Sequence, residues 1–255
     1  MIPIFKSHYS VGKSILTFQK AKDPSKRSDP PFSIIDIALQ EKISPLFIVD
    51  DNMSGFMEAY TNCSDVEIPI IFGLRLIVTS DIDDKNEDSL KTESKIIILP
   101  KNSNGFYDLC KISTIASTNG FYYQPRIDYN YLNKLWTNNL KLCIPFYDSF
   151  LFNNSFYFKY CIPDFTKIEP TFFLEDNDLP FDRLMNVKLT KFIAGKYDTQ
   201  RVKSIYYKDR ADFKAYLTYR CIHNRSTLAK PEFAHLSSAE FCIESWKEAK
   251  ERNEG

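Results

Sequence analysis

Short apolar runs alternate with amphipathic stretches along most of the 255-residue chain. The runs with the length and composition of β-strands cover residues 44–49, 68–79, 95–99, 140–146, 156–162 and 202–207. Strands that alternate with helices predict a largely parallel sheet, and the chain length fits one sheet closed into an α/β barrel. The pattern therefore predicts a single domain with a full core.

Helical spacing predicts the elements between these strands. Asn52 is expected to cap a segment in which Phe56 and Tyr60 share one face. Apolar residues also recur at helical spacing in residues 105–117, 129–136 and 209–222. The apolar residues of 170–197 fit either period only in part, so the pattern leaves this segment unassigned.

Two polar segments are expected to form surface loops. Residues 21–31 contain three prolines, and residues 80–94 contain six carboxylates. The carboxylates lack the glycine and terminal glutamate of an EF-hand, which favours a solvated insertion over a calcium loop.

Charge and composition narrow the possible functions. Lys and Arg number 33, as do Asp and Glu, so the formal net charge is zero. Nonspecific DNA binding normally needs a basic excess, so we expect contact with nucleic acid to be weak or indirect. The 21 Phe and 15 Tyr residues are expected mostly in the core or in a protein interface, rather than stacked on bases.

Cysteine spacing and hydropathy indicate the compartment. The six cysteines include no C-x-x-C pair, which favours reduced, buried thiols over a zinc site or a disulfide framework. Neither a run of about 18 apolar residues nor a charged, apolar leader is present, so we expect a cytoplasmic protein without a membrane segment.

The segment Asn119-Gly120-Phe121-Tyr122-Tyr123-Gln124-Pro125-Arg126-Ile127-Asp128 resembles the G-F-Y-Y-x-P-R-I-D signature of one family. That family is the polymerase and histidinol phosphatase (PHP) domain found at the front of bacterial DNA polymerase III alpha subunits. Residues 45–78, 95–118 and 204–241 resemble further family blocks in the family order. The resemblance implies a distorted TIM-like (β/α)7 barrel of the PHP type, as a single domain over residues 1–255.

PHP enzymes hold divalent metals, and the resemblance places most of their ligands at residues that cannot bind a metal. The family histidines of the first strand, "H-x-H-x-H-S-x-Y-S", align with Ile2, Ile4 and Lys6. The aspartate and histidine of "T-D-H-G-N-M" align with Asp50 and Asp51. Only Asp50 survives as a family ligand in these two blocks.

The remaining ligand positions are also changed. The glutamate of "G-x-E-x-Y" aligns with Arg75, and the late aspartate and histidine align with Ser204 and Tyr206. The motif "x-L-E-x-x-R-H-G" aligns less securely with 156–164, where Lys159 and Pro163 stand at the ligand positions. The three histidines of the chain, His8, His223 and His235, are expected to have structural roles. We therefore expect no bound metal and no other cofactor.

Arg75 offers one replacement for the lost cations. The alignment places it at the end of a strand beside Asp50 and Asp51, so its guanidinium could pair with either carboxylate. The alternative is that Arg75 points into solvent.

The C-terminal residues 237–255 resemble the start of the helix through which the family continues into the polymerase. Ser245 and Glu248 have the S-x-x-E form of a capping box that opens a helix. Trp246 is the expected anchor for a protein partner, and the alternative is that it packs the helix against the barrel. A PHP module separated from the polymerase is typical of phage or mobile-element replication, which would place the protein in the host cytoplasm.

Three functions follow from the resemblance. The first is a noncatalytic module that docks onto, or stabilises, a DNA polymerase or a proofreading exonuclease. The second is a residual metal-dependent phosphoesterase or 3′–5′ exonuclease that uses Asp50 and Asp51, with Asp148 or Asp164. The third is a repurposed mimic that binds host replication proteins.

Overall fold

The structure, a computed structural model, describes residues 1–19, 31–230 and 233–254. Within this part of the chain the strands form one eight-stranded sheet. They are β1 (Ile2–Phe5), β2 (Leu46–Asp50), β3 (Ile70–Thr79), β4 (Ser94–Pro100), β5 (Arg126–Asp128), β6 (Leu140–Ile144), β7 (Pro170–Leu174) and β8 (Asp198–Ile205).

Seven of these strands close into a ring in the order β2-β1-β8-β7-β6-β4-β3, because β3 pairs back onto β2. The eighth, β5, joins the end of β3 outside the ring. β4 runs antiparallel to β3 and β6, whereas the other neighbours in the ring are parallel. The predicted, largely parallel (β/α)7 barrel is confirmed, and the reversed β4 is part of its distortion.

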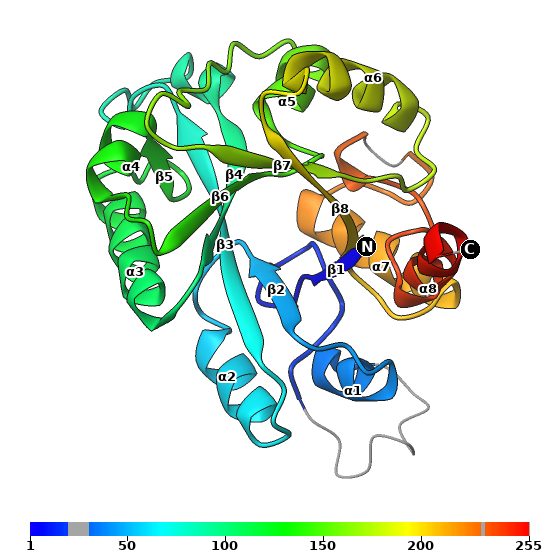
Figure 1. Cartoon of the computed structure of the whole chain (residues 1–255). Coiled ribbons are helices and arrows are strands. Elements are labelled where there is room, and N and C mark those ends of the chain that lie inside the picture. The colour runs from blue at the N-terminus through cyan, green and yellow to red at the C-terminus, as the bar shows by residue number, and fades with distance from the viewer. Residues whose placement is uncertain (20–30, 231–232, 255) are drawn as a thin grey trace.

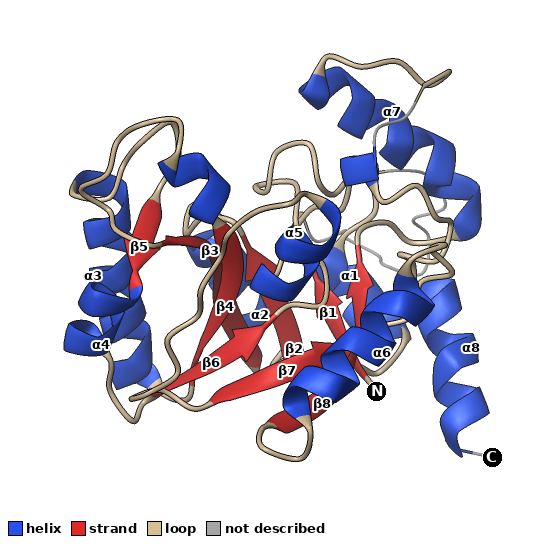
Figure 2. Ribbon diagram, turned by 90° about the horizontal axis from the view of Figure 1, so that it is seen from above, coloured by secondary structure: helices blue, strands red, loops and turns tan. Residues whose placement is uncertain are grey.

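Helices surround the strands (Figure 1). In the view from above, α3 and α4 lie on one side of the sheet, and α6, α7 and α8 lie on the other (Figure 2). The α-helices are α1 (Ile34–Gln40), α2 (Phe56–Ser64), α3 (Ser103–Thr118), α4 (Tyr129–Leu135), α5 (Phe150–Phe156), α6 (Asp182–Ile193), α7 (Phe213–Asn224) and α8 (Ile243–Glu254). The 3-10 helices are η2 (Ser89–Thr92), η3 (Arg210–Asp212) and η4 (Phe233–His235).

The inside of the barrel is filled by apolar side chains from six of the seven ring strands. These inward-facing residues are Ile4, Val49, Ile97, Leu99, Cys143, Phe173 and Val202. The seventh strand, β3, contributes Gly73, whose backbone lies so close to its neighbours that an added Cβ would come within 2.4 Å of the Leu99 side chain. A glycine at this position therefore lets the β3 backbone approach the filled interior.

Inside the barrel, a layer of polar side chains follows the apolar layer, because alternate residues of each strand face inward. Side chains two residues apart on a strand face the same side of the sheet. Two positions beyond the apolar layer, towards the carboxyl ends of the parallel strands, the inward positions are Lys6, Asp51, Arg75, Glu175 and Ser204. The reversed β4 brings Lys95 to the same end of the barrel, where it pairs with Ile77 of β3. The strand period therefore brings polar residues from six strands to one end of the barrel, and five of these residues are charged.

Five of the six strands expected from apolar runs are present, as β2, β3, β4, β6 and β8. The sixth prediction, a strand at residues 156–162, is wrong. The ring position beside β6 is taken by β7, so this segment has no strand to pair with. After α5 the chain turns at Phe158, which has a φ of 52°, and continues without regular structure.

Because residues 156–162 form no strand, three large apolar side chains of this segment lie in solvent. Phe158, Tyr160 and Ile162 are 82%, 70% and 84% exposed, whereas Cys161 between them is buried. We call these three exposed residues the apolar strip. Exposed apolar groups that gather in this way often mark an interaction surface.

Helix predictions differ from the structure mainly at helix starts. Gly55, not Asn52, precedes α2, and the Asn52 Oδ1 atom accepts a hydrogen bond from the Ser54 N–H instead. The segment at 209–222 divides into η3 and α7. The unassigned segment at 170–197 contains β7 and α6.

The two expected loops have different outcomes. Most of the first, residues 20–30, lies outside the described residues. In the second, the carboxylates of Asp81, Asp83 and Asp84 are exposed, but Ile82 and Glu93 are buried. Buried Arg126 fastens this loop, since its guanidinium donates to the Asp84 carbonyl at 3.2 Å and lies 3.4 Å from the Glu93 carboxylate. The insertion is therefore only partly solvated.

The final helix packs back onto the barrel. Trp246 is 6% exposed, it shares a core cluster with Phe5 and Ile205, and its indole N–H donates to the Met1 carbonyl at 3.2 Å. This is the intramolecular packing considered above, and it leaves the indole unavailable as an anchor for a partner. The helix begins at Ile243, so Ser245 is not its cap, and the Ser245 hydroxyl instead donates to Glu240.

Candidate functional site

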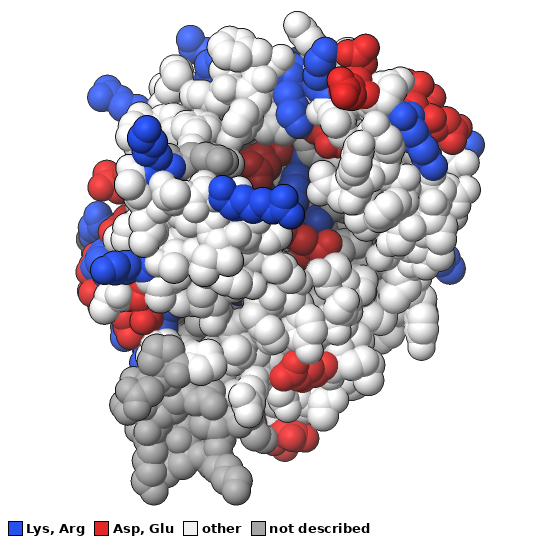
Figure 3. All heavy atoms as spheres, turned by 180° about the vertical axis from the view of Figure 1, so that it is seen from behind, with Lys and Arg blue, Asp and Glu red and all other residues white. Residues whose placement is uncertain are grey.

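The candidate site is the carboxyl end of the barrel, where the polar inward layer opens into the strand-to-helix loops. Active sites of α/β barrels are built at this end. Figure 3, the view from behind, shows basic and acidic side chains of this face together in a hollow. We call this end the charged mouth and define it by the residues that the next paragraphs describe.

Asp51 is the centre of the charged mouth. Its Oδ1 atom lies 3.0 Å from the Lys6 Nζ atom and 3.7 Å from that of Lys95, and its Oδ2 atom lies 3.0 Å from the Lys13 Nζ atom. Burial alone would raise the pKa of Asp51, but the three ammonium groups hold that pKa well below its usual range. Asp51 is therefore an ionised carboxylate enclosed by cations.

The three lysines differ in how burial and Asp51 shift their pKa values. Burial lowers the pKa of Lys6 to about 8, although the Asp51 carboxylate acts against it. Burial also holds the pKa of Lys95 well below its usual value, whereas Asp51 outweighs burial at Lys13 and raises the pKa there. Of these three lysines, only Lys6 was expected from the sequence. Lys95 begins a block in which the family has a histidine, which is a signal that could have identified it.

Arg75 forms an ion pair with Asp148, which was not one of its expected partners. Its Nη2 atom donates to the Tyr147 carbonyl at 2.8 Å and to Oδ2 of Asp148 at 3.1 Å, and the side chain is only 8% exposed. The predicted pairing with Asp50 or Asp51 is therefore corrected to Asp148, and Arg75 does not point into solvent. The Nε atom of Arg75 has no hydrogen-bond partner among the described protein atoms.

Asp50, the surviving family ligand, is held by serines. One of its oxygens accepts hydrogen bonds from the Ser7 N–H at 2.9 Å and the Ser10 hydroxyl at 2.7 Å, and the other accepts one from the Ser7 hydroxyl. Burial raises the pKa of Asp50, although Lys6 and these donors oppose the shift. Both serines lie in the first-strand motif quoted above, but their role as donors was not anticipated.

Glu175 is a further carboxylate of the charged mouth, which the sequence patterns did not indicate. It follows β7 directly, and its oxygens accept hydrogen bonds from the Ser204 N–H at 3.1 Å and the Ser204 hydroxyl at 2.9 Å. Burial raises the pKa of Glu175, against the pull of its hydrogen-bond donors.

The other expected site residues do not join this cluster. Ile4 lies in the apolar layer below it, and Ile2 is half-buried at the start of β1. Tyr206 is buried and stacks on Phe241 with 5.0 Å between ring centroids. Asp164 accepts hydrogen bonds from Asn133 and from the Thr166 N–H instead of facing the mouth.

The histidines lie elsewhere. His8 packs against the Tyr9 ring at 4.4 Å, and its Nδ1 atom has no partner among the described protein atoms. His235 is buried, with its ring nitrogen 3.3 Å from the Ser226 hydroxyl. His223 packs against Gly12, where an added Cβ would collide with the imidazole.

A metal cluster does not fit these residues. Within the described residues there is no group of three His, Cys, Asp or Glu side chains placed to hold a metal ion. Lysine and arginine nitrogens are donors only and cannot be ligands while they are protonated. At Asp51 and Asp148 these cations already contact the carboxylates, and at Asp50 and Glu175 serine donors do so.

Two spaces adjoin the charged mouth. A small cavity of about 20 Å³ lies inside the barrel, with Lys6, Arg75, Glu175 and Ser204 in its lining. It has room for roughly one water molecule. A wider opening of about 280 Å³ lies at the surface, with Lys95, Asp148 and Lys159 among its lining residues.

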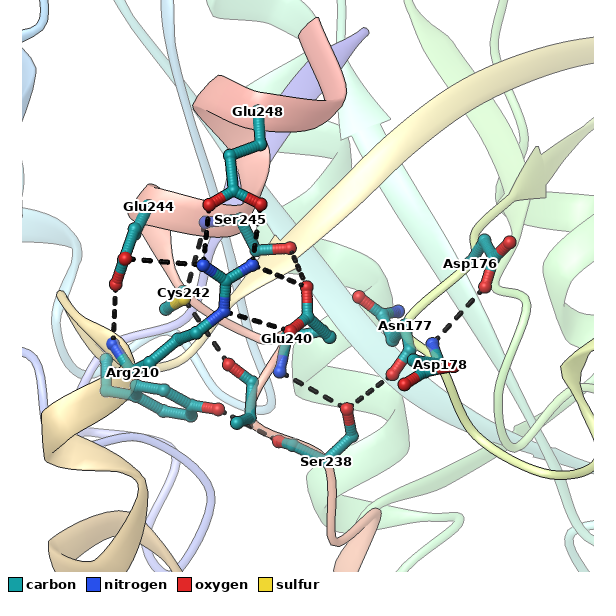
Figure 4. Close-up of polar contacts among 12 residues, drawn as sticks. Asp176, Asn177, Asp178, Arg210, Ser238, Glu240, Cys242, Glu244, Ser245 and Glu248 are labelled. Carbon is teal, nitrogen blue, oxygen red and sulfur yellow. Dashed lines mark hydrogen bonds and ion pairs between the residues drawn. The ribbon is translucent and has the colours of Figure 1, made fainter. Parts of the chain in front are cut away.

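A second charged cluster lies beside α8, away from the mouth. Arg210 contacts three glutamates, Glu240, Glu244 and Glu248, at 3.0, 3.2 and 2.6 Å (Figure 4). These hydrogen bonds raise the pKa of Arg210. Glu248, expected to belong to a capping box, is instead a partner of Arg210.

The closed seven-stranded ring, with its polar end, points to a barrel of the PHP class. A PHP domain model matches residues 28–153, and the chain carries a PHP domain. The first strand of the chain, β1, and its last two strands, β7 and β8, lie outside the matched segment.

Curated relatives agree with this assignment. The chain is 36% identical over 100 residues to the DNA polymerase III subunit alpha of Chlamydia trachomatis, over 38% of this chain and 8% of the relative. It is 33% identical over 104 residues to that of Borreliella burgdorferi, over 40% of this chain and 9% of the relative. The Aquifex aeolicus subunit is 36% identical over 90 residues, over 32% of this chain and 8% of the relative. The chain thus matches a small part of each relative.

The helices give no sign of a membrane span. In the part of the chain that the structure describes, none is both long enough and apolar enough to cross a bilayer.

Proposed function

We propose that this protein is a noncatalytic PHP module of a DNA replication system, which docks onto a polymerase or a proofreading exonuclease subunit and stabilises it. The observation that carries the proposal is the contact of Lys6 and Lys13 with Asp51 at the charged mouth. The similarity to DNA polymerase III alpha subunits supplies the replication context.

The lack of catalysis follows from the chemistry that a phosphoesterase needs. Metal ions lower the pKa of a bound water and neutralise the phosphodiester during attack. An ammonium group can neutralise charge, but it cannot bind a water as a Lewis acid does. The mouth therefore retains positive charge without a means of generating a hydroxide nucleophile.

The apolar strip is the surface that we assign to docking. Phe158, Tyr160 and Ile162 lie on an irregular segment fixed by backbone hydrogen bonds, including one from the Tyr160 N–H to the Lys91 carbonyl at 2.8 Å. Large aromatic and aliphatic side chains on a fixed backbone are typical of interface cores. In the isolated chain these three side chains are exposed to solvent. A docked partner would bury their apolar surface.

Binding to purified subunits tests the docking role. The alpha subunit and the proofreading exonuclease of the source cell are each immobilised, and binding of the wild-type chain is measured by interferometry. We expect at least one to bind, and serine at all three strip positions to weaken binding by more than tenfold, as expected for a buried hot spot. Leu184→Ser with Ile222→Ser is the control, because both residues are exposed and lie on α6 and α7, away from the strip segment in the sequence.

Two results would contradict the assignment. If neither subunit binds the wild-type chain, the docking role is wrong. If the control variant weakens binding as much as the strip variant, the surface has been misplaced.

A further inference from the structure

Cations outnumber the carboxylates that contact them at the charged mouth. Lys6, Lys13 and Lys95 share the single carboxylate of Asp51, and Arg75 contacts Asp148. Four positive groups therefore meet two negative ones.

The other two carboxylates of the charged mouth, Asp50 and Glu175, offset less of this positive charge. The oxygens of Asp50 and Glu175 accept hydrogen bonds from Ser7, Ser10 and Ser204, and neither carboxylate lies within ion-pair distance of a described lysine or arginine. The excess of positive charge is thus concentrated around Asp51.

The outer ammonium groups have unused donors. An ammonium group carries three N–H donors. Within the described residues, the contact of the Lys95 Nζ atom is with Asp51 at 3.7 Å, beyond hydrogen-bond distance, and Lys13 contacts the other Asp51 oxygen at 3.0 Å. Their side chains are 17% and 27% exposed, compared with 5% for Lys6. Lys13 and Lys95 can therefore reach a ligand that enters from solvent.

The surface opening gives such a ligand access to Lys95, which shares the Asp51 carboxylate with Lys13. It has Lys95 and Lys159 in its lining, together with Asp148 and Glu93. These two carboxylates are engaged, since Asp148 pairs with Arg75 and Glu93 lies 3.4 Å from the Arg126 guanidinium. At about 280 Å³, the opening is far larger than the roughly 30 Å³ that a water molecule occupies in the liquid.

We propose that the charged mouth binds one phosphate group without a metal, with the ammonium groups of Lys13 and Lys95 as its direct ligands and Lys159 at the entrance. A dianion matches the excess of two positive groups, and its oxygens accept the unused N–H donors. Burial and neighbouring cations hold the pKa of Lys95 well below its usual value, so a bound anion would relieve an existing cost. Phosphate binding at the mouth does not depend on the docking role, because the apolar strip is a separate set of side chains.

Calorimetric titration with inorganic phosphate at pH 7 tests this site, with ionic strength kept constant by sodium chloride. We expect saturable binding of one phosphate per chain. Lys13→Met and Lys95→Met should each weaken it by at least tenfold, because each removes a charged ligand. Lys95→Arg should retain binding within about threefold, since it keeps the charge and the donors.

Lys141→Met is the matched control. It removes one positive charge from an exposed residue of β6, near the amino end of the barrel. Melting curves for all variants separate lost binding from lost folding, and Lys95→Arg serves if the methionine variants do not fold. Absence of saturable heat, or equal weakening by Lys141→Met, would overturn the proposal.

A second titration with adenosine 5′-monophosphate identifies the source of the phosphate. Binding of both compounds with similar affinity indicates recognition of the phosphate group alone, and tighter binding of the nucleotide indicates a phosphate carried on a larger molecule. Binding of the nucleotide without any binding of inorganic phosphate would place recognition in the base or sugar and overturn the assignment.

Discussion

The Nζ atom of Lys6 lies 3.0 Å from Oδ1 of Asp51, and the two residues occupy positions where the family has histidines. One histidine position has thus become a cation and the other its counter-ion. In the alignment with the family motifs, this ion pair stands where the resemblance places two neutral metal ligands. The ion pair compensates the charge of Asp51 within the protein itself.

We expect the purified protein to contain no stoichiometric zinc, manganese or iron and to hydrolyse no phosphodiester. The reason is that protonated lysine and arginine cannot bind a metal and already contact Asp51 and Asp148. Elemental analysis and an assay with bis(p-nitrophenyl) phosphate, with and without added manganese, check this prediction. One metal per chain, together with activity that Asp50→Ala abolishes, would contradict it.

Asp51→Asn should lower the free energy of unfolding at pH 7 by about 3 kcal/mol, because loss of one partner leaves buried charges uncompensated. Asp148→Asn is the comparison, and we expect a smaller loss because that side chain is 36% exposed. Urea denaturation of both variants measures the difference. Equal stability of wild type and Asp51→Asn would show that the lysines do not need this carboxylate.

The effect of Asp51 should also depend on acid pH. Its pKa is held well below the usual value in the folded state. Its contribution is therefore fully present above the unfolded pKa, near 4, and is lost as the pH falls through the folded value. We expect the stability difference between wild type and Asp51→Asn to shrink below about pH 4.

Alkaline pH should have the opposite effect through Lys6. The pKa of Lys6 falls from 10.5 to about 8 on folding, so between these values the unfolded chain binds more protons than the folded one. Stability then rises with pH across this window, and Lys95 acts in the same direction. Urea midpoints from pH 7.5 to 9.5 should increase in wild type relative to Lys6→Met. A flat difference between the two would contradict the depressed pKa.

The barrel could be predicted from sequence because apolar runs mark its strands, but the neighbours in the ring could not. The run at 156–162 has strand composition, yet its alternate residues Phe158, Tyr160 and Ile162 face solvent. Periodicity does not say whether an apolar face meets the core or a partner. β7 was missed because its short apolar run lies in a segment of mixed period.

Several residues of the site could be predicted from sequence, but the ion pairs between them could not. Position in the family motifs identified Asp50, Asp51 and Arg75, because strand ends are fixed by the fold. The partners come from loops and from the reversed strand β4, as Asp148 and Lys95 do. Contacts between such distant segments depend on three-dimensional placement that local pattern does not contain.

Gly73→Ala should destabilise the barrel by about 1–3 kcal/mol, because the added methyl group enters a filled interior. Its Cβ would lie 2.4 Å from the Leu99 side chain and 3.3 Å from that of Val49. Leu99→Val removes the closest atom, so the double variant should be more stable than the sum of the single effects predicts. Thermal and urea unfolding measure this coupling, and strict additivity would argue against the contact.

Trp246→Ala should act on folding and not directly on binding. Loss of a buried tryptophan costs roughly 3–5 kcal/mol. Tyr160→Ala, which truncates an exposed aromatic side chain, should leave stability nearly unchanged. Unfolding curves check the prediction, and a stable Trp246→Ala protein that has lost partner binding would restore the tryptophan as an interface anchor.

The contacts of Arg210 with three glutamates restrain the orientation of α8 relative to the barrel. Glu244 and Glu248 lie one helical turn apart on α8, and the Arg210 guanidinium holds both while it also binds Glu240 in the preceding turn. A helix fixed at two successive turns is restrained in rotation about its own axis as well as in tilt. A polypeptide joined rigidly to α8 would therefore keep the orientation that these contacts favour.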